Sequence, residues 1–190
     1  RCSGRMAEDI AVGTGSTNNI GRAVAERLAA DGYHVVVTSR HGGEAAEVAD
    51  GLATPGSSFE VDFADADQVL DLFGYVDDLE GRLSVLVNNV ARTSNESVLE
   101  CDLDTWQRTI DTNLRSYFLC TREAGRRMKE TGGGAIVNVT VSITETSTDS
   151  KFSYMTSKGG VDFMTKTAAL DLAPHDVRVN AVGSGLVGTP

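Results

Sequence analysis

Tyr154 and Lys158 are the side chains whose types and spacing most clearly allow chemistry. They are four residues apart, so they share one face if the segment that begins at Ser153 is a helix. A phenol, with a pKa of about 10, is a poor base at neutral pH, but a cation about 4 Å away contributes on the order of 4 kcal/mol at an effective dielectric constant of about 20. We therefore expect Lys158 to lower the pKa of Tyr154. The same spacing also arises by chance on helix surfaces, so the neighbouring motifs must decide whether this pair is functional.

A glycine-bearing turn at residues 14–21 could bind an anion. It follows a short apolar run and leads into a segment of helical period, so free backbone N–H groups and the helix dipole both point at it. The turn is either a phosphate site or simply a tight strand-to-helix connection. Its candidate cofactor contacts are Gly15, Thr17, Asn19 and Ile20.

Ser39 and Arg40 end the second apolar run. In a dinucleotide-binding fold, an acidic residue at this point holds the ribose 2′-hydroxyl, and a basic one accommodates a 2′-phosphate. The sequence therefore favours NADP(H) as the cofactor and leaves NAD(H) possible. The alternative is that Arg40 is an ordinary solvated loop charge.

The elements around these residues alternate between short apolar runs and longer helical patterns, which is typical of repeated βαβ units. The predicted strands are residues 10–12, 33–39, 57–62, 83–88, 135–141 and 177–182. Helices are predicted to begin near Ile20, Gly42, Asp65, Thr105 and Ser153, and Gly132 to Gly134 should end the fourth. The helix from Thr105 is expected to bury one stripe, made of Trp106, Ile110, Leu114, Tyr117, Phe118 and Thr121.

This pattern predicts an α/β fold, a doubly wound parallel sheet in a three-layer αβα arrangement. By analogy with the Rossmann pattern, its strand order should be 3-2-1-4-5-6 and the cofactor should lie at the carboxyl ends of the strands. The chain of 190 residues is expected to form one dinucleotide-binding and catalytic domain at residues 9–190, preceded by an N-terminal extension at residues 1–8.

Composition narrows the choice of partner. A net charge of -10 argues against nucleic acid and against anionic membranes, because both bind basic surfaces. Cys2, Cys101 and Cys120 lack the spacing of a disulfide framework or a zinc site, so no metal is expected. With no long apolar run either, the sequence predicts a cytoplasmic protein that acts on a small molecule.

Taken together, the motifs resemble the short-chain dehydrogenase/reductase family over nearly the whole chain, and in particular its 3-oxoacyl reductase-like members. Residues 14–21 are similar to the T-G-x-x-x-G-x-G turn, with Asn19 in place of the middle glycine, which Asn can replace because it tolerates left-handed backbone. Residues 88–91 resemble N-N-A-G, and Tyr154 to Lys158 resembles Y-x-x-x-K. Residues 180–189 resemble N-x-x-x-P-G-x-x-x-T, with Ser184 replacing the proline.

The resemblance implies roles for these positions. Tyr154 would protonate a carbonyl oxygen during reduction or deprotonate an alcohol during oxidation, and Lys158 would hold the nicotinamide ribose. Asn113 would loosen the fourth helix and join a water relay to the lysine. The remaining cofactor contacts implied by the family are Asp62 and Phe63 at the adenine, Asn88 on the adenosine side, and Val187 and Thr189 at the carboxamide and pyrophosphate. Asp62 could equally be a strand-end cap.

The family's catalytic serine is the main departure. Val141 stands thirteen residues before Tyr154, where that serine is expected, and valine donates no hydrogen bond. Ser142 is the favoured substitute, and Thr140 is an alternative if the strand is kinked. Because strand side chains alternate, Val141 and Ser142 cannot both face the substrate without a bulge.

The sequence therefore predicts an oxidoreductase that transfers a hydride between NADP(H) and a carbonyl or secondary alcohol. The rival is a catalytically impaired, cofactor-binding or regulatory member of the same fold. Halohydrin dehalogenase chemistry is disfavoured by Lys158, and enoyl reductase chemistry is disfavoured because the longer Tyr-to-Lys spacing ends on Val161. By resemblance, a homodimer or homotetramer is expected through the fourth and fifth helices, and a C-terminal part of the family's fold is expected to be missing.

Overall fold

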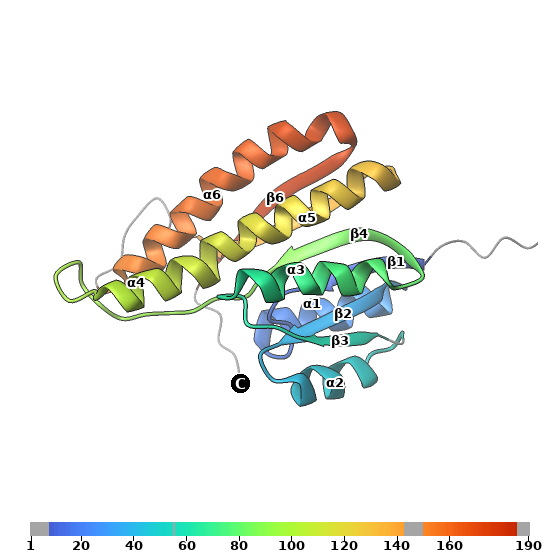
Figure 1. Ribbon diagram of the computed structural model, residues 1–190, viewed down its shortest axis with the longest axis horizontal. Coiled ribbons are helices and arrows are strands. Elements are labelled where there is room, and N and C mark those ends of the chain that lie inside the picture. Colours follow the sequence, from blue (N-terminus) through green and yellow to red (C-terminus); the bar gives the residue numbers. More distant parts are fainter. Residues whose placement is uncertain (1–7, 55, 143–149, 186–190) are drawn as a thin grey trace, which may run out of the picture.

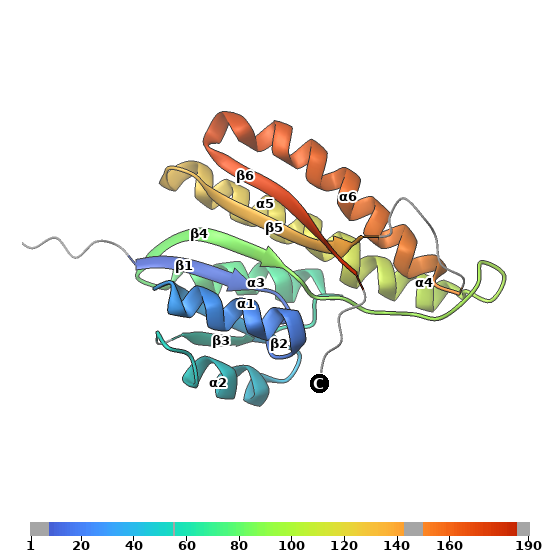
Figure 2. The same cartoon turned by 180° about the vertical axis from the view of Figure 1, so that it is seen from behind.

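The computed structural model describes residues 8–54, 56–142 and 150–185. Six parallel strands form one sheet in the order β3-β2-β1-β4-β5-β6, which confirms the predicted order. The strands are β1 (Glu8–Gly13), β2 (His34–Ser39), β3 (Ser57–Glu60), β4 (Gly81–Asn88), β5 (Gly134–Val141) and β6 (Val177–Ser184). Figure 1 shows the carboxyl end of β4 on the side of α4 (Leu103–Ile110), and Figure 2 shows β1, β4, β5 and β6 pointing toward that same edge. Residues 1–7, most of the expected N-terminal extension, lie outside the described residues.

Two layers of helix cover the sheet. One apolar cluster joins the sheet to α1 (Asn19–Ala30) and α2 (Gly42–Asp50), and the other joins it to α3 (Ala66–Asp77), α5 (Ser116–Thr131) and α6 (Phe152–Leu172). The run Val35-Val36-Val37 in β2 is fully buried, and Val36 faces the second cluster while its neighbours face the first. This alternation is why the continuous apolar run predicts a strand covered on both faces. Figure 2 shows α1 and α2 in front of their half of the sheet.

The fourth predicted helix is interrupted. It consists of α4 (Leu103–Ile110), a π-helical segment at Asp111–Arg115 and α5. A π-helical turn holds more residues than an α-helical one, so side chains beyond it face a different direction. Beyond the π segment the predicted stripe is confirmed at Tyr117 and Thr121, which are buried, and wrong at Phe118, which is 48% exposed, while Cys120 is a buried residue that the stripe did not include.

Buried amides tie the centre of the sheet together near its carboxyl edge. The Nδ2 of Asn88 donates to Asn138 Oδ1 at 2.9 Å, and the Nδ2 of Asn138 donates to Thr165 Oγ1 at 2.8 Å. The chain of bonds crosses from β4 through β5 to α6. Because Asn88 is completely buried, it supports the sheet from within.

Candidate active site

A cavity of about 650 Å³ opens at the carboxyl ends of the strands. Most of the residues that the sequence singled out line it, namely Gly15, Thr17, Asn19, Ile20, Arg40, Asp62, Phe63, Tyr154 and Lys158. Three others, Asn88, Asn113 and Ser142, do not line the cavity as the structure describes it. Val187 and Thr189 lie outside the described residues.

The glycine-bearing turn has the backbone that its sequence predicts. Gly15 has φ +60° and Asn19 has φ +50°, so the asparagine adopts the left-handed conformation expected of it. A Cβ on Gly21 would lie 2.3 Å from the Gly15 carbonyl oxygen, so only glycine fits there. Asn18, the N-cap residue of α1, gives the helix no side-chain cap. The first N–H groups of α1 are therefore left for an anion in the cavity.

The Asn89 amide fixes this turn from the end of β4. Its Nδ2 donates to the carbonyl oxygens of Gly15 at 2.9 Å and Thr14 at 3.2 Å. In return, the Thr14 hydroxyl accepts from the backbone N–H groups of Asn89 at 2.8 Å and Val90 at 3.0 Å. This role of Asn89 was not predicted from the sequence, from which Asn88 was expected to lie on the adenosine side of the cofactor. Strand alternation is the signal that could separate them, since neighbouring residues at a strand end face opposite ways.

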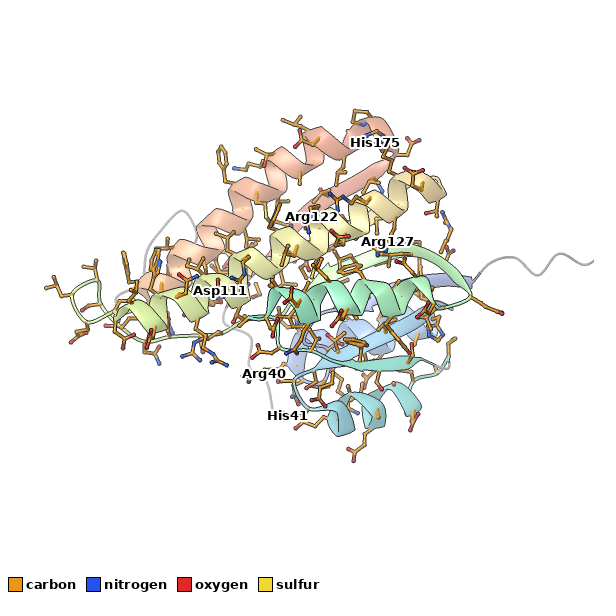
Figure 3. All side chains as sticks on the ribbon, viewed as in Figure 1. Arg40, His41, Asp111, Arg122, Arg127 and His175 are labelled. Atoms are coloured by element: carbon orange, nitrogen blue, oxygen red, sulfur yellow. The ribbon has the colours of Figure 1, made fainter. Side chains whose placement is uncertain are left out.

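Basic side chains outnumber acidic ones around the cavity. Arg40, Arg92, Arg108 and Lys158 line it, against Glu44 and Asp62. The chain as a whole carries a net charge of -10, so the positive charge is local. Figure 3 shows Arg40 beside His41, just ahead of α2 at the carboxyl edge. This charge distribution suits an anionic ligand.

Two of these arginines differ in how they are held. Arg108 Nη2 lies 3.4 Å from Asp62 Oδ2, so the side chains of the two residues already partner each other. Arg92 Nε is buried and has no hydrogen-bond partner among the described residues. An unpaired buried donor on the wall of a cavity is available to an anion bound there.

Lys158 is buried beneath the cavity, with only 2% of its surface exposed. Its Nζ donates to the Val139 carbonyl oxygen at 2.8 Å and to Tyr117 Oη at 3.2 Å, and it lies 4.9 Å from the centre of the Tyr117 ring. An ammonium group has three donors, so one remains for a ligand. Burial lowers the pKa of Lys158 to about 8, against a smaller opposing effect of Asp162.

Tyr154 lies on the same helix face, half-buried on the cavity wall. Its pKa is raised above the ordinary value because burial disfavours the phenolate. The expectation that Lys158 lowers this pKa is therefore wrong for the protein alone. The reason is that desolvation by burial dominates at Tyr154.

Asn113 is fully buried in the π-helical segment, so the predicted loosening of the helix at this residue is present. Its Oδ1 accepts from Arg92 N at 2.7 Å, and its Nδ2 donates to Arg92 O at 2.9 Å and Ser157 Oγ at 3.0 Å. The side chain thus joins the segment after β4 to helix α6. The water relay to Lys158 stays a prediction.

The hydroxyl groups around Val141 do not support Ser142 as the substitute for the family's serine. Thr140 and Ser184 line the cavity, whereas Ser142 is exposed just beyond the end of β5. The β5–β6 ladder runs regularly to the Val141–Ser184 pair and continues with Ser142 N donating to Ser184 O at 3.0 Å. No bulge turns Ser142 toward the cavity. Ser184, which sequence analysis noted only as a replaced proline, is a further hydroxyl at the site.

The described part of the chain contains no group of three or more His, Cys, Asp or Glu side chains placed to hold a metal ion. None of its helices combines the length and the apolar character needed to cross a membrane.

Comparison with known proteins agrees with this geometry. The family model described as short chain dehydrogenase matches residues 9–190. The chain is 36% identical to a 3-oxoacyl-[acyl-carrier-protein] reductase of Synechocystis sp., over 97% of this chain and 76% of that protein. It is also 36% identical to a 3beta-hydroxysteroid dehydrogenase of Mediterraneibacter gnavus, over 98% of this chain and 69% of that protein. A crystal structure of a metagenomic short-chain oxidoreductase in complex with NADP superposes with a TM-score of 0.90 at 27% identity, covering 96% of this chain and 84% of the other.

We predict that Gly21→Ala damages both the fold and the anion site, because the new Cβ would collide with the Gly15 carbonyl. The free energy of unfolding in urea should fall by about 1–3 kcal/mol, as for other overpacked sites. Calorimetry should show NADPH affinity reduced at least about 10-fold, equivalent to about 1.4 kcal/mol. Gly43→Ala is the matched control, since a Cβ there meets nothing within 4 Å. Affinity in Gly21→Ala equal to that of the control would contradict the assigned role of the turn.

Proposed function

The chain belongs to the short chain dehydrogenase family, and on this premise we propose that it transfers a hydride between NADP(H) and the carbonyl or secondary alcohol of a small-molecule substrate. The observation that carries this proposal is that Tyr154 and the buried Lys158 line one cavity with the glycine-bearing turn of α1. A proton donor and an anion site therefore share a single space.

The residues present fit a nicotinamide dinucleotide. The uncapped start of α1, the left-handed backbone at Gly15 and the missing side chain at Gly21 together form a cradle for a pyrophosphate. Arg40 would accept the 2′-phosphate, and the free donor of Lys158 would bind the nicotinamide ribose. When bound, NADPH supplies the hydride. The other proposed contacts are Thr17, Asn19, Ile20, Asp62, Phe63, Val187 and Thr189.

Tyr154 is suited to act as the proton donor in reduction. Because burial raises its pKa, the phenol keeps its proton at neutral pH and can pass it from Oη to the substrate's carbonyl oxygen. The phenolate left behind would then lie near the positive charge of Lys158, which is fixed in place by Val139 and Tyr117. In oxidation the same group would accept the proton of the alcohol as a phenolate.

A second hydrogen bond to the substrate oxygen would come from a hydroxyl on the β5–β6 side of the cavity. Thr140 and Ser184 are supported for this role because both line the cavity. Ser142 does not line it and would reach the substrate only if the end of β5 moved. We therefore propose Thr140 or Ser184 for this role ahead of Ser142. No observation favours the rival of a cofactor-sensing protein without turnover, since Asn19 adopts the backbone that the turn requires.

An assay panel can begin from the groups named in the relatives. The relatives are a 3-oxoacyl reductase and a 3beta-hydroxysteroid dehydrogenase, so a 3-oxoacyl thioester and a 3-oxosteroid are sensible first carbonyl substrates for this chain. Both carry a ketone, the group that Tyr154 would protonate.

We also propose a homo-oligomer through the surface of α5 and α6, the helices that carry the family-derived expectation of a dimer. Phe163 and Leu170 on α6 are 69% and 77% exposed, and Phe118 on α5 is also exposed. A groove of about 370 Å³ runs between the two helices. Figure 3 shows Arg122 on α5 and His175 after α6, both of which line it. Exposed aromatic rings around such a groove are typical of an interface between subunits.

Tyr154→Phe should reduce kcat for carbonyl reduction by at least about 100-fold, the usual contribution of a general acid. The Kd for NADPH should stay within about twofold, since no hydrogen bond of the turn is touched. Steady-state kinetics measures the loss of kcat in the variant. With 4-deuterated cofactor, the same assay measures the primary isotope effect of the parent enzyme. Tyr75→Phe, at a ring that packs on Phe59 away from the cavity, is the control. Unchanged turnover in Tyr154→Phe would rule out the proposed mechanism.

Arg40→Ala should weaken NADPH binding about 10-fold and leave NADH binding unchanged, because only NADPH carries the 2′-phosphate. Calorimetric titration of the parent and the variant with each cofactor gives the ratio of their Kd values for NADPH and for NADH. Arg178→Ala, an exposed arginine on β6 that does not line the cavity, should alter neither. Equal losses for the two cofactors would show that Arg40 contributes general charge and does not select NADP(H).

Phe118→Glu should convert the oligomer to a monomer, because Phe118 is exposed on the groove and a carboxylate buried in an apolar interface loses its water without gaining a partner. Light scattering after size-exclusion chromatography measures the mass. Leu99→Glu introduces the same charge at a position that is 94% exposed and far from the groove in sequence, and it should leave the mass unchanged. A parent protein that is already monomeric would contradict the proposed interface.

A further inference from the structure

Glu96, in the segment between β4 and α4, is a buried carboxylate outside the cavity. It is 8% exposed, and no arginine, lysine or histidine forms a salt bridge with it within the described part of the chain. A buried charge without an ion pair is unfavourable unless hydrogen bonds replace its water. Here Glu96 Oε1 accepts from Ser94 Oγ at 3.0 Å, Ser153 N at 3.2 Å and Ser153 Oγ at 2.5 Å.

These hydrogen bonds keep the carboxylate charged. Burial alone would raise the pKa of Glu96, but the donors on Ser153 and Ser94 outweigh burial and hold the pKa below its usual value. Glu96 is therefore an anion at neutral pH. Its position at the start of α6 adds the favourable interaction of a negative charge with the positive end of the helix dipole.

The helix α6 has no cap of its own. Its N-cap residue is Lys151, whose side chain makes no capping hydrogen bond, although the first N–H groups of any helix need partners. Glu96 supplies two of them from a distant part of the chain. Its backbone oxygen accepts from Phe152 N at 3.1 Å, and its carboxylate accepts from Ser153 N. Glu96 thus takes the place that Ser, Thr, Asp or Asn usually fills next to the helix.

Neighbouring contacts hold the same turn. Lys151 Nζ donates to Asn95 Oδ1 at 2.8 Å, and the Phe152 ring packs on Trp106 of α4 with ring centres 5.6 Å apart. Tyr154 is the next residue after Ser153, so its phenol is carried by this first turn. Lys158 lies one turn further on and is anchored separately to Val139.

We propose that Glu96 is a positioning residue for the reaction, capping α6 through Ser153 and so holding Tyr154 in register with Lys158 and the cavity. The proposal rests on the proposed role of Tyr154 as proton donor. An uncapped first turn would fray, which displaces Tyr154 while the buried Lys158 and the turn of α1 keep their own hydrogen bonds. Loss of Glu96 should therefore affect proton transfer and leave cofactor binding intact.

The test compares Glu96→Ala and Glu96→Gln with the matched control Glu100→Gln. Glu100 lies on the same segment, but it is exposed and its carboxylate accepts only from Ser97. Each variant is assayed for kcat, for the Kd of NADPH by fluorescence titration, and for hydrogen exchange of peptides covering residues 150–160. Assays run at least 15 °C below the measured Tm, so that loss of stability alone does not reduce kcat.

Glu96→Ala should lower kcat about 10- to 100-fold, the scale expected when a reacting group is displaced by about 1 Å. The Kd for NADPH should stay within about twofold, and the first turn of α6 should exchange faster. Glu96→Gln keeps one acceptor oxygen and should recover most of kcat. Glu100→Gln should match the parent in all three measurements.

Three results would overturn the proposal: Glu96→Ala with the kcat of the control, a loss of kcat matched by an equal loss of NADPH affinity, or unchanged exchange at residues 150–160. If the parent protein turns over no carbonyl, the proposed function fails on its own account. Whether Glu96 caps α6 is then decided separately by hydrogen exchange. Equal protection of α6 in Glu96→Ala and Glu100→Gln would refute the cap.

Discussion

Burying the ammonium group of Lys158 costs several kcal/mol unless polar groups replace its water. Two elements supply them, since Val139 gives a carbonyl from β5 and Tyr117 gives a hydroxyl from α5. The Tyr117 hydroxyl also donates toward the Val90 oxygen at 3.1 Å, which links the end of β4 to the same centre. The need to solvate one buried cation therefore draws β4, β5, α5 and α6 together at the cavity.

The π-helical segment follows from the same requirement. Asn113 within it bonds to both backbone groups of Arg92, and the altered phase beyond it turns Tyr117 inward beneath Lys158. The same phase leaves Phe118, which the sequence predicted to be buried, 48% exposed. We infer that the irregular turn is kept because it delivers a polar group to the buried lysine, as π segments at functional sites often do.

The sequence predicts the features of this fold that depend on local pattern. The positions of the strands, the turn of α1 and the left-handed Asn19 follow from apolar periodicity and backbone preference, and the strand order follows from analogy with the Rossmann pattern. It misses what depends on contacts between distant segments. The pKa of Tyr154 was misjudged because the burial that raises it comes from distant parts of the chain that the local sequence does not reveal. Asn89 was overlooked for Asn88 because the motif gives both residues and only strand geometry separates them.

The contact between Glu96 and Ser153 also joins distant parts of the chain, and it shows why such contacts matter at this site. Residues 150–153 read Ser-Lys-Phe-Ser, and the N-cap position itself holds lysine, which has no acceptor to offer the helix. A local cap would make the start of α6 independent of the rest of the fold. With the cap supplied by Glu96, the start of α6 is stable only when the segment after β4 is in place. That segment also provides Asn89 to the glycine-bearing turn and Arg92 to Asn113. One stretch of chain thus contacts the anion site, the buried asparagine and the helix turn of Tyr154, each through its own hydrogen bonds, so loss of the Glu96 carboxylate can displace Tyr154 while the other two stay in place.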